Sequence, residues 1–497
     1  MAGGLIQLVA YSKQDIFLTN DPQITFFKIV YRRHTNFTLE VIPQNFLHHL
    51  DFGKRVSSVI SRNGDLIRNI QLVIDLPSIP IFRNGNNNDI LTKFAWVRRI
   101  GYAIIKTVEV EIGGELIDRQ YGDWLNIWHE LTISDKVNLD KILGNIKELT
   151  DYTSGKKSYR LMIPLRFWFN RIAGLALPIV SLQYNNVKIT VELNEFDKCY
   201  LLSPTNYIEV ENAFVNFKPY EYIKQSQHNH EIVGQFVHFD ILERKLYYNK
   251  ISENAFTSKY DIIGVKSKFT ATPTHDAIEK IYKNRNFDCN SVSIKKSFLL
   301  VEYAFLDDDE RLRFLKARHE YLIEQLIYNG ETSVSGLHQS FMVGFTNPCK
   351  ELLWVTQLRR AQQLNQTFNY TDSIITNKDG NYLGKNMIKK ETILYNGHER
   401  LSMRNSKYFT DIQVYQNHSH APSEGINVYS FALHPENHQP SGTANLSEIE
   451  NVNLRVSINP KINFNSSFIR IYGIVYNIFR IANGVSGIMF ALDYQNN

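Results

Sequence analysis

The stretch Val110-Glu-Ile-Gly-Gly-Glu-Leu-Ile117 places Gly113-Gly114 between two strand-like runs. Apolar and polar residues alternate before the glycines, which is the period of a half-buried strand. Both central residues of a type I′ turn need a positive φ, and glycine adopts such angles freely. The stretch therefore predicts a tight β-hairpin.

The same pattern returns in the second half of the chain as Leu394-Tyr-Asn-Gly-His-Glu-Arg-Leu401. Val110 matches Leu394, and the glycine and glutamate positions also coincide. An aromatic–apolar pair follows at the same distance in both halves, Trp124-Leu125 and Tyr408-Phe409. The match predicts that a hairpin and the segment after it occur twice.

A second match follows in the same order, between Asn186–Val191 and Asn451–Val456. Each is an alternating strand that opens with Asn-Val. Two matches in one order favour a duplicated β domain, with a seam between Leu193 and Ser297. Each copy would close its own core.

Strand-like runs dominate the rest of the chain, so the sequence predicts a mainly β fold. Alternation within Arg166–Asn170 predicts a strand that places Trp168 opposite Phe167 and Phe169. Two helices and one long polar loop complete the prediction. The strands are Ile24–Tyr31, Ile70–Leu76 and Val187–Leu193; the helices are Asp123–Ser134 and Asp308–Ile327; the loop is Asn365–Asn386.

Composition excludes several classes of protein. The 497 residues are too many for one core and favour two domains. With 55 Lys and Arg against 50 Asp and Glu, the net charge is only +5. The sequence has no long basic tract, which argues against a nucleic-acid-binding protein. The 3 cysteines are far apart, as in proteins of a reducing compartment. The first residues do not read as a signal peptide, and we expect no membrane-spanning stretch.

Several long segments, in order along the chain, resemble one known family. They are Ala10–Phe37, Arg166–Asn170 with Gly174–Pro178 and Leu182–Tyr184, Phe305–Arg311 with His319–Gln325, and Tyr429–Thr443. This set is similar to the major capsid proteins of nucleocytoplasmic large DNA viruses. The resemblance implies two consecutive eight-stranded jelly-roll β-sandwiches with short helices and long loops. It also implies a homotrimer with a pseudo-hexagonal outline that tiles an icosahedral shell.

The resemblance and the repeat together predict four parts of the chain. Residues 1–25 form an N-terminal arm, 26–217 the first jelly roll, 218–296 an insertion or linker, and 297–497 the second jelly roll. Shorter members of the family lack the insertion. We expect it, and the Asn365–Asn386 loop, to lie mainly in exposed loops or small appended elements.

Candidate chemical sites are weak. His434 and His438 are four residues apart, with His418 and His420 nearby, but Pro435 and Pro440 would break an aligning helix. The acidic run Asp307–Glu310 fits a helix N-terminus better than a cation site. We therefore expect no catalytic residue, no cofactor and no metal.

N-glycosylation requires an Asn-x-Ser/Thr sequon. The sequons at Asn365 and Asn369, in the long loop, are the only candidates for glycosylation.

The expected function is that of a structural shell protein, not an enzyme. Expected partners are copies of the chain, neighbouring trimers, and minor capsid and penton proteins, near an inner viral membrane. Sequence-specific nucleic acid binding is not expected. The expected location is the virion capsid, assembled in the host cytoplasm. Two alternatives stay open: a minor capsid or penton-type jelly-roll paralogue, and a carbohydrate-binding β-sandwich.

Overall fold

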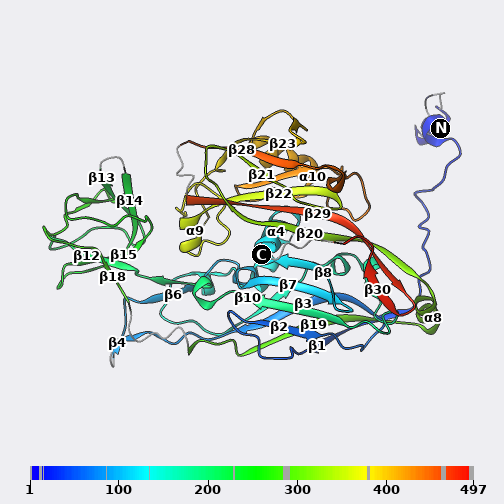
Figure 1. Cartoon of the computed structure of the whole chain (residues 1–497), viewed down its shortest axis with the longest axis horizontal. Helices are drawn as coiled ribbons and strands as arrows, with labels where there is room; N and C mark the ends of the chain where they lie inside the picture. Colours follow the sequence, from blue (N-terminus) through cyan, green and yellow to red (C-terminus); the bar gives the residue numbers. More distant parts are fainter. Residues whose placement is uncertain are drawn as a thin grey trace.

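The computed structural model describes residues 3–10, 14, 16–84, 87–133, 135–227, 230–283, 291–377, 381–460 and 466–491. Two β-sandwiches are stacked on each other, a smaller β domain projects from one end, and the N-terminal segment leaves from the other end (Figure 1). The long axis of the molecule therefore has two different ends.

The first sandwich has two four-stranded sheets, β1-β19-β3-β9 and β2-β10-β7-β8. All pairs within them are antiparallel. The strands are β1 Phe37–Gln44, β2 Arg55–Val59, β3 Leu66–Leu76, β7 Ile105–Ile112, β8 Glu115–Tyr121, β9 Tyr159–Pro164, β10 Val187–Leu193 and β19 Lys296–Leu306.

The second sandwich repeats this order as β20-β29-β22-β26 and β21-β28-β23-β24. Short strands β25 (Arg404–Asn405), β27 (Ala444–Asn445) and β30 (Val485–Ile488) add to its sheets. The main strands are β20 His319–Ser333, β21 His338–Met342, β22 Pro348–Leu358, β23 Ile388–Tyr395, β24 His398–Glu399, β26 Ile426–Ser430, β28 Val452–Ile458 and β29 Ser467–Ala482.

Numbered along the chain, the strands of each sandwich pair in the orders 1-8-3-6 and 2-7-4-5. This is the jelly-roll arrangement of two sheets that share long crossovers. The chain is thus a double jelly roll, and the predicted fold class is confirmed.

The sequence repeat corresponds to equivalent strands. The first hairpin joins β7 to β8, with Gly113 and Gly114 at φ 63° and 88°. The second joins β23 to β24, with Asn396 and Gly397 at φ 49° and 84°. The other matching pair is β10 and β28, the seventh strand of each roll.

The seam between the rolls lies later than the sequence predicted. Strand β19 pairs with β1 and β3, so it is the eighth strand of the first roll. The predicted start of the second roll at residue 297 is therefore wrong. The connection is helix α8 (Asp308–Lys316), which follows β19 directly. The sequence of an apolar strand does not indicate which domain it is in. The strands that pair with it, which are distant in sequence, determine this.

The insertion is a folded domain between the seventh and eighth strands of the first roll. Its sheet has the order β17-β16-β13-β14-β15-β12-β18, and its buried residues form a separate core that includes Ile208, Phe236 and Tyr248. It begins at Asn206, earlier than the predicted residue 218. The strands are β12 Asn206–Glu209, β13 Tyr222–Gln227, β14 His230–Asp240, β15 Lys245–Lys250, β16 Ile262–Gly264, β17 Thr270–Ala271 and β18 Lys280–Ile281.

Helices are short and lie between strands. Helix α4 (Gly122–Thr132) agrees with the prediction, although Ser134 lies outside the described residues. The helix predicted to end at Ile327 ends at Lys316, because β20 pairs with β29 from His319 onward. Other short elements are β4 Arg83–Asn84, β5 Asn87–Asn88, β6 Lys93–Trp96, α3 Ile100–Ala103, α5 Lys136–Ile142, α6 Lys147–Thr150, α7 Trp168–Arg171, η1 Ala173–Leu175, η2 Phe196–Lys198, β11 Tyr200–Ser203, α9 Arg359–Gln363, η4 Tyr408–Ile412, α10 Gln413–Asn417 and η5 Leu446–Glu448.

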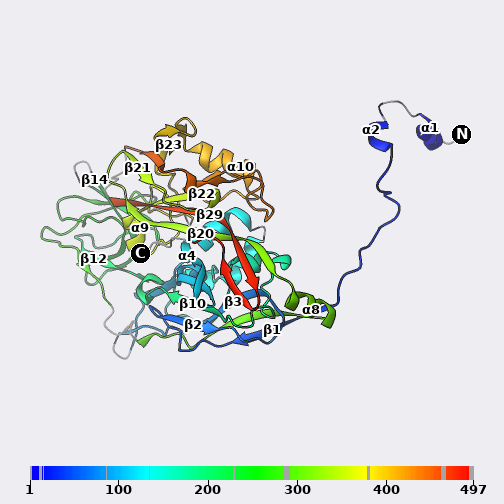
Figure 2. The same ribbon diagram turned by 45° about the vertical axis from the view of Figure 1, so that its right-hand side comes forward.

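The N-terminal arm extends away from the body (Figure 2) and reaches Asn36, so the predicted boundary between residues 25 and 26 is wrong: the first strand of the roll begins at Phe37. The arm contains short helices α1 (Gly3–Val9) and α2 (Ile16–Thr19). The strand predicted over Ile24–Tyr31 is not formed; this segment contains a turn at Phe26 and Phe27 and is exposed, with Phe27 98% accessible. A strand-like run does not form a strand without a neighbouring strand to pair with.

Candidate assembly surfaces

Helix α4 lies between the two rolls and contacts both. Its Trp124 ring lies 5.7 Å from the ring of Tyr472 on β29, and both side chains are buried. Close by, Trp168 of the first roll contacts Phe479 of the second at 5.8 Å. One core cluster runs from the first sandwich to the outer face of the β20-β29-β22-β26 sheet, so the two rolls share a hydrophobic boundary.

Asp123, at the start of α4, is held by side chains of the second roll. Its carboxylate accepts hydrogen bonds from Arg470 (2.9 Å), from the Tyr472 hydroxyl (2.8 Å) and from Tyr370. Burial would lower the pKa of Arg470, but the nearby Asp123 charge outweighs it and raises that pKa. The guanidinium stays charged, and a buried charge without its partner is costly. This network fixes the orientation of one roll relative to the other.

A second buried ion-pair group lies beside α7. Glu324 of β20 accepts from Lys350 of β22 at 2.5 Å and from Arg171 of the first roll. Burial lowers the pKa of Lys350, although the Glu324 charge opposes this. The group borders a cavity of about 250 Å³ lined also by Trp128 and His438. Because Glu324 is already shared by two cations, the group acts as a tie between the rolls.

The predicted alternation around Trp168 is wrong. Phe167 precedes helix α7, which begins at Trp168, and all three rings from Phe167 to Phe169 are buried. A helical turn can direct consecutive side chains into one core, whereas a strand cannot. Trp168 meets the second roll through its ring contact with Phe479.

The four candidate histidines do not gather. His418 is buried between Glu351 (2.6 Å) and Glu436 (3.1 Å). His434 is exposed, His438 borders the cavity, and the backbone N–H of His420 donates to the carbonyl of Leu131 at 3.1 Å. Within the described residues, no group of three or more His, Cys, Asp or Glu is placed to hold a metal ion. The absence of a metal and of a cofactor stays a prediction.

His418 has a role that the sequence did not indicate. Burial would lower its pKa, but the charges of Glu351 and its hydrogen bonds to both glutamates raise the pKa to about 9. The imidazolium is therefore a buried structural cation. Glu351 lies far from His418 in sequence, so spacing along the chain gave no signal for this contact.

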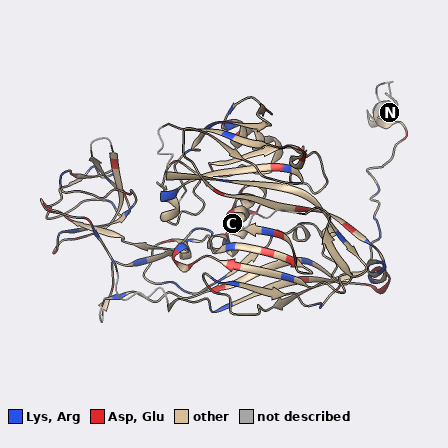
Figure 3. Cartoon of the chain, viewed as in Figure 1, with Lys and Arg blue, Asp and Glu red and all other residues tan. Residues whose placement is uncertain are grey.

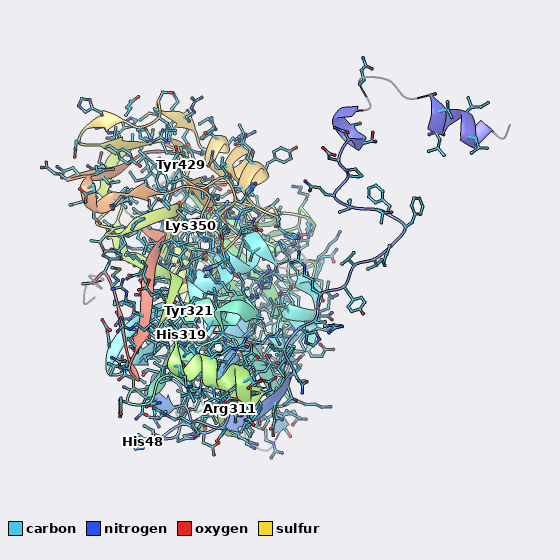
Figure 4. All side chains as sticks on the ribbon, turned by 90° about the vertical axis from the view of Figure 1, so that its right-hand side faces the viewer. His48, Arg311, His319, Tyr321, Lys350 and Tyr429 are labelled. Carbon is cyan, nitrogen blue, oxygen red and sulfur yellow. The ribbon has the colours of Figure 1, made fainter. Side chains whose placement is uncertain are left out.

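The acidic run Asp307–Glu310 begins helix α8, as predicted. The Asp307 carboxylate accepts the backbone N–H of Glu310 at 3.0 Å. Arg311 then donates to both oxygens of Asp65 in the first roll, at 2.9 and 3.1 Å. Figure 4 shows Arg311 below His319 and Tyr321, with Lys350 higher in the second roll. Arg311, which directly follows the acidic run, thus anchors the connecting helix α8 to the first roll.

Neither candidate sequon presents a free amide nitrogen. Asn369 is fully buried and donates to Gln366 and to the carbonyl of Ser373. Asn365 donates to the carbonyls of Asp197 and Tyr200, at 2.6 and 2.9 Å. The structure argues against both glycosylation candidates, because a glycan would have to replace these hydrogen bonds.

The loop that carries the sequons is also less exposed than predicted. Residues Phe368–Thr371 are all less than 9% exposed, and Tyr370 reaches Asp123 of the first roll. Residues 378–380 of this loop lie outside the described part of the chain. The expectation of an exposed loop is therefore wrong for this stretch.

The exposed apolar residues gather in a few places. Strand β1 is an edge strand whose Phe37, Leu39 and Val41 are 53%, 41% and 54% exposed. The arm exposes Phe26 and Phe27, and helix α10 exposes Tyr415. Acidic and basic residues are interspersed over both rolls, with no single basic face in the view shown (Figure 3). Where described, no helix has the length and hydrophobicity needed to cross a bilayer.

Two jelly rolls in one chain, tied by buried charges and carrying apolar outer surfaces, define a class of structural proteins that act through their surfaces. The chain belongs to the major capsid proteins of large eukaryotic DNA viruses. One family model, described as the major capsid protein N-terminus, matches residues 25–240; another, described as large eukaryotic DNA virus major capsid protein, matches residues 310–487.

Relatives cover the whole chain. It is 40% identical to probable capsid protein 4 of Acanthamoeba polyphaga mimivirus, over 99% of both chains. It is 32% identical to the major capsid protein of Phaeocystis pouchetii virus, over 99% of this chain and 100% of that one. The Faustovirus major capsid protein has the same fold, with a TM-score of 0.65, 11% identity, and coverage of 95% of this chain and 94% of that one. The protein is thus a structural component of the virion capsid.

Proposed function

We propose that the chain forms a homotrimeric, pseudo-hexagonal capsomer that tiles the icosahedral shell of a large double-stranded DNA virus. The observation that carries this proposal is the stacking of two equivalent rolls. The α4 side of the first roll packs on the β20-β29-β22-β26 sheet of the second. The contact is heterologous, since each roll uses a different face.

In a heterologous contact, each roll uses only one of the two contacting faces. The other face of each roll is left without a partner within the chain. The second roll exposes Ile412 and Tyr415 on the helical segment that follows its fifth strand, and the first roll exposes Leu39 and Val41 on its β1-β19-β3-β9 sheet. When such contacts repeat between chains, they make a ring if the rotation closes and a filament if it does not. A rotation of about 60° per roll closes after three chains, with pseudo-sixfold symmetry that suits hexagonal tiling.

The proposal extends to the partners and the place of assembly. The chain binds copies of itself within the trimer, then neighbouring trimers, and at special positions minor capsid and penton proteins. It acts in the virion, is assembled in the host cytoplasm, and lies near an inner viral membrane. It reads no nucleic acid sequence and catalyses no reaction. Both rolls are complete, which a penton-type paralogue would not need.

Measuring the mass of the purified protein tests the proposal. Native mass spectrometry or light scattering at micromolar concentration should give three times the chain mass of 57.8 kDa. The trimer should persist on dilution, because an obligate interface buries more than about 2,000 Å². A monomer throughout this range would overturn the proposal. A glycan array provides the test of the carbohydrate-binding alternative, for which we expect no binding.

A further inference from the structure

The segment η4–α10 of the second roll is the equivalent of helix α4 in the first. Each follows the hairpin between the fourth and fifth strands. In the alignment of the two hairpins, Leu125 corresponds to Phe409, and both are buried in their own roll. The shared place in the topology and the shared core contact support this alignment independently.

Helix α4 meets the second roll along one face, since its Trp124 contacts Tyr472 and its Trp128 and Leu131 follow four and seven residues later on that face. Trp128 and Leu131 are 5% and 0% exposed. Both belong to the core cluster that includes Tyr472, Leu353 and other residues on the outer face of the β20-β29-β22-β26 sheet. In the first roll, this helix face is therefore an occupied docking surface.

The corresponding side chains in the second roll are uncovered. Trp128 aligns with Ile412, which is 45% exposed, and Leu131 aligns with Tyr415, which is 88% exposed. These two side chains, three residues apart in the sequence, leave apolar surface uncovered on this short helical segment. The repeat shows what kind of surface covers this position: the outer face of a sheet with the order 1-8-3-6.

The first roll has the other such sheet, β1-β19-β3-β9, whose outer face is packed against Phe314 at Ala304 and is exposed around Leu39 and Val41. Val41 pairs with Glu302 and Leu39 with Ala304, on the side opposite the core residues Val301 and Tyr303. Leu39 and Val41 are about half exposed (41% and 54%). This sheet lies at the far side of the molecule from α10 (Figure 1), so a single chain cannot bring the two surfaces together.

We propose that Ile412 and Tyr415 of one copy dock on the outer face of the β1-β19-β3-β9 sheet of a second copy, around Leu39 and Val41. The inference rests on the proposed trimer and names its interface. The contact repeats between chains what α4 does within one chain. Each trimer then holds three internal and three intermolecular contacts of the same kind.

Cysteine accessibility tests the docking without disturbing it. Tyr415→Cys should react with a maleimide about tenfold more slowly in the trimer than in urea-dissociated protein, because access requires opening of an interface. The matched control is Leu242→Cys on the insertion, 94% exposed, which should react quickly in both states. Equal rates for the two cysteines in an intact trimer would overturn the inference.

Charge substitutions on the two faces give a second test. The pairs Ile412→Asp with Tyr415→Asp, and Leu39→Asp with Val41→Asp, should each reduce the trimer to monomer with unchanged circular dichroism. The side chains are exposed in the monomer, so folding should tolerate the changes. If the unmodified protein is monomeric, the proposed function fails. If it is trimeric and both double variants stay trimeric, only the docking inference fails.

Discussion

At the scale of single residues, packing rather than chemistry determines which substitutions matter. Phe167 and Phe169 are fully buried and stack on each other at 5.8 Å. Truncation of such a ring to alanine costs about 3–5 kcal/mol, through lost burial and the cavity left behind. We expect Phe167→Ala and Phe169→Ala to lower the melting temperature and the yield of trimer, measured by differential scanning calorimetry and size-exclusion chromatography.

The matched controls are polar residues that the sequence made conspicuous. His434 is exposed, and the Asp308 side chain is 93% accessible, so His434→Ala and Asp308→Ala should stay within about 0.5 kcal/mol of the parent. His438→Ala should also have little effect. A chelator should leave the melting temperature unchanged. A drop on metal removal would show that a histidine or acidic cluster binds a structural ion.

The raised pKa of His418 predicts that the protein loses stability at alkaline pH. Its pKa is about 9 in the folded protein and 6.5 as the ordinary value. Because the folded pKa is the higher one, the stabilisation is complete below pH 6.5 and is lost as the pH rises through 9. The full effect is at most about 3 kcal/mol. Thermal melts from pH 6 to 10 should show this decline, and His418→Gln should flatten it.

The exposed His434 provides the comparison for that measurement. His434→Gln should keep the alkaline decline of the parent protein, since this side chain has no buried partner to lose. An unchanged slope in His418→Gln would mean that other groups cause the decline. The sequence could not reveal this site, because the contact of His418 with Glu351 spans 67 positions and depends on the fold.

At the scale of elements, the insertion is the part that can be removed. It has its own core, and its ties to the rolls include polar contacts, such as Tyr222 with Thr376 and Arg360 with the carbonyl of Ile251, and the stacked rings of Tyr152 and Tyr220 at 6.1 Å. Replacing residues 206–281 with a short Gly-Ser linker should cost the rolls only about 1–2 kcal/mol, the worth of such contacts. The shortened chain should still elute as a trimer.

An insoluble or monomeric product would show that the insertion supports the rolls or their interface. Limited proteolysis gives an independent view, since the β14–β15 turn exposes Leu242 (94%) and should be cut first. The buried stretch Phe368–Thr371 should resist cleavage. Cleavage there before the turn would contradict its packing against the first roll.

The sequence could predict features that are determined by neighbouring residues, but not those that depend on contacts between distant residues. The hairpins at Gly113-Gly114 and Asn396-Gly397 were visible because a turn is specified by adjacent residues. Strand β19 was recognised as a strand but assigned to the wrong roll, because its partners β1 and β3 lie more than 200 residues away. The burial of Tyr370 was likewise invisible, since it depends on Asp123 of the other roll.

At the scale of the whole molecule, the two ends of the long axis carry different structures. The insertion occupies one end, and the arm leaves from the other (Figure 1). Residues Gly4–Ala10 are exposed along their length, so they contribute nothing to the core of their own chain. Exposed apolar residues on such an arm gain stability only when another surface covers them.

Deletion of residues 2–20 should therefore separate folding from assembly. We expect the shortened protein to keep its melting temperature and its trimer, because the removed residues whose exposure is described, 4–10, 14 and 18–20, are all exposed. Shells or flat arrays seen by negative-stain electron microscopy should become fewer, because neighbouring trimers or minor proteins lose a binding segment. Phe26→Ser with Phe27→Ser, which keeps the length of the arm, should impair assembly in the same way if apolar contact is the cause. A shortened protein that neither folds nor trimerises would instead make the segment part of the subunit core.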